Sequence, residues 1–166
     1  MPGHRESRER SGPPSFASNG SRNRAMRQKP TELAEEVWRA YEQAGELKPT
    51  LLELRKSILN VARTCEIAVE ETLKWGAPAF VTPSGVGTTL RIEYDSSPAK
   101  RYYLRVHCQS SVVDRFRVKS GKRFEYDGTR GLVFSAEQKR PDVDEFVRLA
   151  LTYHIWKKKG SAAAGK

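Results

Sequence analysis

EETLKWGAPAF, the stretch from Glu70 to Phe80, marks the point where the chain changes its pattern. Before it, apolar residues recur at the spacing of a helix; after it, they alternate as in strands. Gly76 and Pro78 are residues that interrupt regular structure. We therefore predict that a helix ends at Trp75, that the chain turns through Gly76 and Pro78, and that a short apolar strand follows.

Helical periodicity precedes this stretch. A first helix is predicted over Thr31–Ala44 with Thr31 as its cap, and a second begins at Pro49. A third, shorter helix is predicted over Glu66–Trp75, where the apolar side chains are Ile67, Val69 and Leu73. The sequence leaves open whether the second and third helices are continuous.

Alternating segments follow the stretch, interrupted by one short helix and closed by a longer one. Strands are predicted over Ala79–Thr82, Thr88–Asp95, Arg101–Cys108, Phe124–Tyr126 and Leu132–Phe134, and helices over Val112–Val118 and Val143–Ile155. Two neighbouring strands with one polar face each indicate an antiparallel sheet covered on one side. The predicted fold class is α+β, in the order α-α-α-β-β-β-α-β-β-α, with about five antiparallel strands and helices packed on one face.

The net charge of +10 is concentrated at the two ends of the chain. Residues 1–30 hold seven Arg or Lys against two Glu, residues 157–166 hold four Lys, and the remainder carries +1. We expect a tail over 1–29 too poor in apolar residues to fold, one domain over 30–158, and a flexible tail over 159–166. An organellar transit peptide is the less favoured interpretation of the first tail, and Met26 is a candidate true start.

The cysteines and the hydropathy of the chain indicate the cellular compartment in which we expect the protein. Cys65 and Cys108 lie far apart without a CxxC spacing, which argues against a disulfide framework and a zinc site. No apolar run approaches the roughly 20 residues that span a bilayer, and the N-terminus lacks the apolar core of a secretory signal. We therefore expect a cytoplasmic protein with no membrane partner.

The segment Lys74–Phe80, KWGAPAF, resembles the signature of the YdhG-like family, a domain of unknown function. Gly128–Phe134 and the helix from Pro141 to His154 occupy matching places, so the resemblance covers about residues 48–155. It implies a frataxin-like two-layer α+β sandwich. It also suggests iron as a possible cofactor, and it supplies no catalytic residues. Ala77 stands where methionine is common in the family.

Acidic residues crowd one face of the first predicted helix. Glu32, Glu35 and Glu36 lie at positions i, i+3 and i+4, and clustered carboxylate oxygens suit hard cations. The three glutamates are the candidate ligands for iron, although a solvated helix face is the more ordinary explanation.

Trp75 is the main candidate for a ligand pocket at the helix-to-strand turn, together with Gly76, Pro78 and Phe80. The favoured interpretation is nevertheless that Trp75 is the main aromatic residue of the core, with Gly76 and Pro78 shaping the turn.

A second group of candidates lies on the predicted polar face of the sheet, where an anion or a protein partner could bind: Arg91, Tyr103, Arg105 and His107. Cross-strand pairing explains the same residues without a ligand. Cys108 and His154 are expected to be buried packing residues.

These observations favour a binding or chaperone-type module without catalysis of its own, with a metal ion or a protein as partner. One alternative is non-specific association with nucleic acid through the basic tails, since Lys and Arg release phosphate counterions on binding. The other is an enzyme with a small pocket near Trp75.

Overall fold

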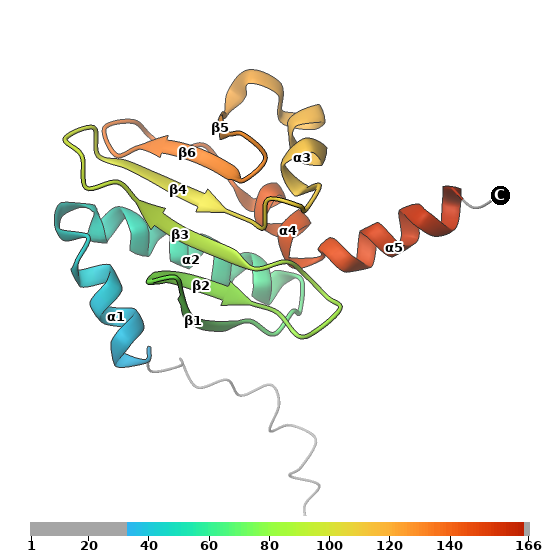
Figure 1. Ribbon diagram of the computed structural model, residues 1–166, viewed down its shortest axis with the longest axis horizontal. Helices are drawn as coiled ribbons and strands as arrows, with labels where there is room; N and C mark the ends of the chain where they lie inside the picture. The colour runs from blue at the N-terminus through green and yellow to red at the C-terminus, as the bar shows by residue number, and fades with distance from the viewer. Residues whose placement is uncertain (1–32, 165–166) are drawn as a thin grey trace, which may run out of the picture. The chain divides into compact units, whose positions relative to one another are not determined.

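The computed structural model describes residues 33–164, so the predicted first tail, Met26, Thr31 and Glu32 lie outside the described residues. These residues form one unit with six strands in a single antiparallel sheet (Figure 1). The strand order is β1-β2-β3-β4-β6-β5, so only β5 and β6 depart from sequence order. The predicted α+β class and the antiparallel sheet are confirmed.

The elements have the following bounds. The helices are α1 Glu35–Glu42, α2 Lys48–Thr64, α3 Val112–Ser120, α4 Asp144–Leu151 and α5 Tyr153–Ala164, with short 3-10 turns at Gly45–Leu47 and Gly121–Arg123. The strands are β1 Glu70–Lys74, β2 Ala77–Val81, β3 Leu90–Tyr94, β4 Arg101–Arg105, β5 Glu125–Asp127 and β6 Gly131–Ser135. The helix α5 thus continues into the stretch for which we expected a tail.

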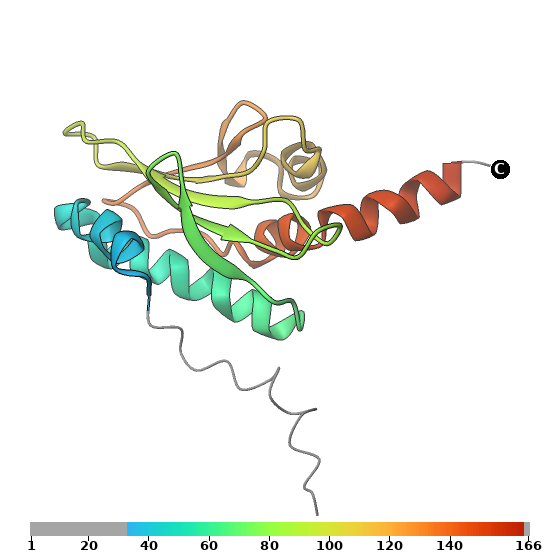
Figure 2. The same cartoon turned by 60° about the horizontal axis from the view of Figure 1, so that its bottom comes forward.

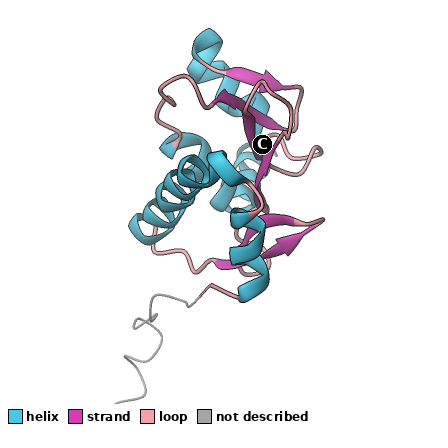
Figure 3. Cartoon of the chain, turned by 90° about the vertical axis from the view of Figure 1, so that its left-hand side faces the viewer, coloured by secondary structure: helices cyan, strands magenta, loops and turns pink. Residues whose placement is uncertain are grey.

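Helices α1 and α2 lie together on one side of the sheet, which leaves the other side open (Figure 2). The core forms between these layers and takes side chains from each described α-helix, including Tyr153 at the start of α5. Figure 3 distinguishes the helices from the strands by colour. Phe116 of α3 contacts Phe146 of α4 edge to face, with ring centroids 5.2 Å apart, which joins α3 to the same core.

The predicted third helix, Glu66–Trp75, is wrong: residues 70–74 form β1. Helix α2 ends with Glu66 at φ +55°, and the amide of Ile67 donates to the carbonyl of Ala62 over 2.9 Å. That bond is the helix-closing contact that usually needs glycine at the left-handed position. Glutamate is not a residue that usually ends a helix, so the sequence does not show that helical structure stops here.

Trp75 and Gly76 form a two-residue hairpin turn between β1 and β2 rather than a helix end. Lys74 pairs with Ala77, and the two residues between them have φ values of +51° and +75°. Positive φ at both central positions defines a type I′ turn, whose twist matches that of the strands it joins. The strand β1 is therefore an edge strand held to β2 along its whole length.

Glu71 ties this edge strand to both helices beneath it. Its carboxylate accepts a 2.8 Å hydrogen bond from the hydroxyl of Tyr41 in α1 and a 2.8 Å bond from Arg55 in α2. Tyr41 is fully buried, and burial, followed by the charge of Glu71, raises the pKa of its hydroxyl. Glu71 is thus an acid on the core face of β1, satisfied by two donors.

The last helix is interrupted, in contrast to the single helix predicted over Val143–Ile155. Thr152 separates α4 from α5. There the amide of Thr88 donates to the carbonyl of Ala150 over 2.8 Å, and the amide of His154 donates to Val86 over 3.0 Å. Gly87 passes so close that an added Cβ would meet the backbone oxygen of Leu151 at 2.4 Å. The loop between β2 and β3 therefore holds the helix break.

Replacing Glu71 by Gln is expected to lower the free energy of unfolding by about 2 kcal/mol, because hydrogen bonds to a charged group are weakened. The neighbouring Glu70, which is exposed, is the matched control: Glu70→Gln is expected to change stability by less than about 0.5 kcal/mol. Urea denaturation measures both. Equal effects of the two variants would contradict the strand assignment.

Gly76→Ala is expected to destabilise the protein by about 1–2 kcal/mol, because an L side chain is strained at positive φ. Gly160→Ala, inside α5 with open space around it, should instead raise stability by about 0.5–1 kcal/mol. Thermal or chemical denaturation of both variants separates strain in the turn from a general effect of adding a methyl group. A Gly76→Ala variant as stable as the parent would disprove the left-handed turn.

Candidate functional site

A cavity of about 740 Å³ lies at the end of the sheet where β3 begins and β4 ends. We call it the Trp75 pocket. Four segments line it: the β1–β2 hairpin, residues 87–91 at the start of β3, residues 106–110 after β4, and the beginning of α5. Arg130 adds a side chain from the turn before β6. The volume lies within the usual range for small-molecule pockets.

Trp75 is not a core residue, which corrects the interpretation favoured from the sequence. Its side chain is 85% exposed, and its ring lies against the guanidinium of Arg91, 4.6 Å from the ring centroid. The cause is the turn itself, which places residue 75 at the tip of a hairpin instead of at the end of a helix. Trp75 therefore forms one wall of the pocket.

The lining is basic. Four cationic side chains and two imidazoles line the pocket, and no carboxylate does: Lys74, Arg91, Arg130, Lys157, His107 and His154. Within residues 33–164, no ion pair joins Lys74 or Lys157 to a carboxylate. Their positive charges are therefore not neutralised by these residues.

A ladder of alternating charges crosses the open face of the sheet and ends in the pocket. Arg91 pairs with Glu93 over 3.1 Å, Glu93 pairs with Arg105, and Arg105 pairs with Asp127 over 3.1 Å. Asp127 lies 3.9 Å from Arg130. Three arginines and two acids leave this ladder with one excess positive charge, and its two ends are the pocket residues Arg91 and Arg130.

Tyr153 and Lys157 face each other one turn apart at the start of α5. The ammonium of Lys157 donates to the phenol oxygen of Tyr153 over 3.0 Å. This hydrogen bond is the main cause of a lowered pKa for the Tyr153 hydroxyl, because it favours the phenolate. The phenol itself is buried at the pocket wall.

Ser110 contributes a hydroxyl group that has no hydrogen-bond partner. Only 4% of this residue is exposed, and its Oγ is buried without a donor or acceptor within reach. Its amide donates to the carbonyl of His107 over 2.9 Å, and its hydroxyl lies beneath the surface of the pocket that the residue helps to line. Buried hydroxyls without partners are rare and call for an explanation.

Three of the residues selected from the sequence meet in the pocket, and five do not. Trp75, Arg91 and His107 line it. Tyr103 and Arg105 lie on the same open face of the sheet but stack on each other, with the guanidinium 4.5 Å from the ring centroid. The other three are Gly76, exposed in the turn, and Pro78 and Phe80, both buried in β2.

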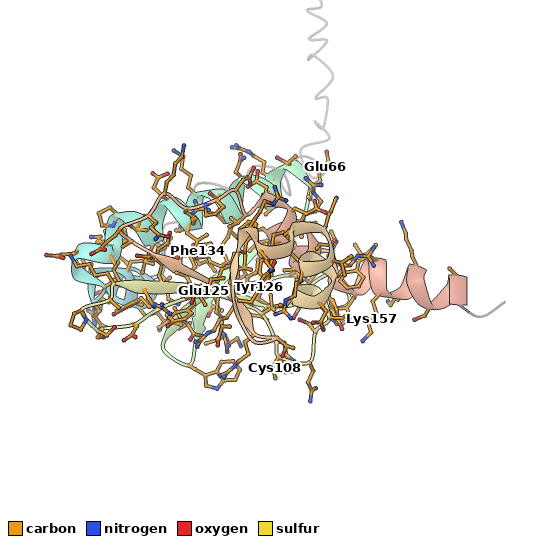
Figure 4. The ribbon with its side chains drawn as sticks, turned by 90° about the horizontal axis from the view of Figure 1, so that it is seen from above. Glu66, Cys108, Glu125, Tyr126, Phe134 and Lys157 are labelled. Atoms are coloured by element: carbon orange, nitrogen blue, oxygen red, sulfur yellow. The ribbon has the colours of Figure 1, made fainter. Side chains whose placement is uncertain are left out.

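Cys108 and His154, expected to be buried, both line the pocket. The alternation of β4 stops at Arg105, so Cys108 is exposed in the loop that follows, and the break before α5 turns His154 out of the core. Figure 4 labels Cys108 on this loop and Lys157 on α5. No motif in the sequence marks the other lining residues Lys74, Ser110, Arg130, Tyr153 and Lys157 as site residues.

The proposed metal ligands are not gathered into a metal site by the described residues. Glu35 pairs with Arg39 and Glu36 is exposed on α1. Over residues 33–164, no group of three His, Cys, Asp or Glu side chains could hold a metal ion. Because Glu32 lies outside that range, the iron hypothesis stays a prediction from sequence.

Comparisons of the chain with protein-family models, with curated proteins and with solved structures find no match. In the described part of the chain, no helix has the length and apolar character needed to cross a membrane.

Tyr153 is expected to ionise at a lower pH than Tyr41, Tyr102 and Tyr126, because the Lys157 hydrogen bond lowers the pKa of Tyr153 and burial raises the pKa of the other three. Its folded-state pKa is lowered, so the stability it contributes is complete above the unfolded value and is lost as pH falls through the folded pKa. Titration of the ultraviolet absorbance of phenolate measures this.

Lys157→Met should shift the ionisation of Tyr153 toward higher pH, and Tyr153→Phe identifies that ionisation by removing it from the titration. Lys158→Met is the control, because it removes an equal charge from an exposed position outside the pocket lining. An ionisation of Tyr153 that Lys157→Met leaves at the same pH would contradict this prediction.

Proposed function

We propose that the protein is a binding module that takes up a small anion in the Trp75 pocket. The observation that carries this proposal is the composition of the lining, with four cationic side chains, two imidazoles and no carboxylate. In a partly closed cavity, such charges attract anions more strongly than they do on an open surface. Lys74 and Lys157 are the two cations of the lining that no described carboxylate neutralises.

The arrangement favours binding over catalysis. A nucleophile needs a base within hydrogen-bond reach, and the base needs a group that orients it. Among the described residues, no hydrogen bond joins the Cys108 thiol to His107 or His154; the Nδ1 atom of His107 instead accepts from the amide of Gln109 over 3.2 Å. The positive groups can hold a charged ligand without this machinery.

We also propose that the domain belongs among the frataxin-like α+β proteins that the YdhG-like resemblance implies. Support comes from the antiparallel sheet with helices α1 and α2 on one side. Under this proposal the segment Lys74–Phe80 is a structural signature, because it forms the hairpin that carries Trp75.

Isothermal titration calorimetry with inorganic phosphate at low ionic strength tests the function. We expect saturable binding to one site on the full chain. Removing two lining charges with Lys74→Gln and Arg130→Gln should weaken it by at least about tenfold, equivalent to about 1.4 kcal/mol.

The matched control removes two exposed charges outside the pocket, with Lys122→Gln and Lys139→Gln. It should leave the affinity within about twofold of the parent. Phosphate binding that both double variants retain equally would instead point to the basic ends of the chain and would contradict the proposal, as would an absence of binding.

A further inference from the structure

The geometry points to a nucleoside phosphate as the ligand, with the base stacked on Trp75 and the phosphate among the cations of the pocket. This inference rests on the proposed anion site and deepens it, because it names the class of anion. Two different features of the same cavity carry it: an exposed aromatic ring and a lining rich in cationic side chains.

The indole of Trp75 is held as a platform. One face of the ring lies on the Arg91 guanidinium, which pairs with the carboxylate of Glu93, two residues further along β3. With 85% of the residue exposed, the ring is open to a second planar partner. Nucleobases stack on such rings, whichever base is present, because every base has a π-face.

The backbone of Trp75 is strained, so holding the indole in this position lowers the stability of the folded protein. Trp75 has φ +51°, a conformation that tryptophan rarely adopts, whereas Asn or Gly would fit this position of a type I′ turn without strain. A strained residue beside a cavity is consistent with a role in binding. A simple phosphate ion would need no aromatic wall, so the ligand carries a ring as well as a charge.

The cationic part of the lining suits a phosphate group. Lys157 and Arg130 supply positive charge there. The amide of His154 at the start of α5 already donates to Val86, so side chains and not this amide would hold the anion. With no carboxylate in the lining, nothing there repels the phosphate.

Titration calorimetry of the full chain with adenosine 5′-monophosphate, ribose 5-phosphate and adenosine tests the inference. We expect the nucleotide to bind about tenfold more tightly than ribose 5-phosphate, through the stacked base. Adenosine, which lacks the phosphate, should bind more weakly than the nucleotide.

Trp75→Leu should abolish the preference for the nucleotide over ribose 5-phosphate while keeping the affinity for ribose 5-phosphate, which shows that the pocket is still folded. Trp38→Leu, at an exposed tryptophan of α1 outside the lining, is the matched control and should keep the preference. Equal affinities for nucleotide and ribose 5-phosphate in the parent protein, or a preference that survives Trp75→Leu, would overturn the inference.

These outcomes separate this inference from the proposed function. Binding of ribose 5-phosphate without any gain from the base overturns the nucleotide alone, whereas failure of every phosphate to bind overturns both. A 5′-phosphorylated tetranucleotide tests whether the bound nucleoside phosphate is a free nucleotide or the end of a nucleic-acid strand. Tighter binding than the mononucleotide supports the end of a nucleic-acid strand, and weaker binding supports a free nucleotide.

Discussion

The left-handed turn at Trp75 and Gly76 is the constraint on which the rest of this architecture depends. Two successive residues with positive φ reverse the chain in the shortest loop that two paired strands allow. This reversal aligns β1 with β2, and it thereby brings Glu71 to the hydroxyl of Tyr41 and the guanidinium of Arg55. It also lifts the indole out of the core and over Arg91.

The open face of the sheet carries a row of paired charges. A sheet face without helices must be stable in water, and the alternating ladder from Arg91 to Arg130 covers it with paired charges. All of its side chains except that of Arg130 are partly buried. The pairing holds two arginines in place at the ends of the ladder, where the pocket begins.

Strands that alternate strictly could be predicted from sequence, whereas β1 could not. Leu90 and Ile92, or Tyr102 and Leu104, mark the core face of their strands unambiguously. In β1 that face carries an acid, Glu71, whose burial depends on donors from distant helices. The chain before β1 turns at Glu66 and the turn after it begins at Trp75, both non-glycine residues at positive φ, so the sequence does not mark where this strand begins and ends.

The pocket was only partly predictable for a related reason. Arg91 and His107 could be selected because both fall on the polar face of strands predicted from the sequence, although β4 ends at Arg105. Lys157 and Tyr153 belong to a helix whose break depends on the loop between β2 and β3, and no local pattern shows a contact between segments about 65 residues apart. Ser110 is an ordinary serine in the sequence, and only its burial without a partner distinguishes it.

The bonds that hold this break join backbone to backbone, from Thr88 to Ala150 and from His154 to Val86. Gly87 must lack a side chain there, because the loop passes close to the backbone of Leu151. The exposed side chains of the lining make none of these bonds, whereas Gly87, Val106 and Tyr153 belong both to the lining and to the frame or the core. Descendants of this chain that keep these buried residues can therefore keep the same cavity while exchanging one ligand for another.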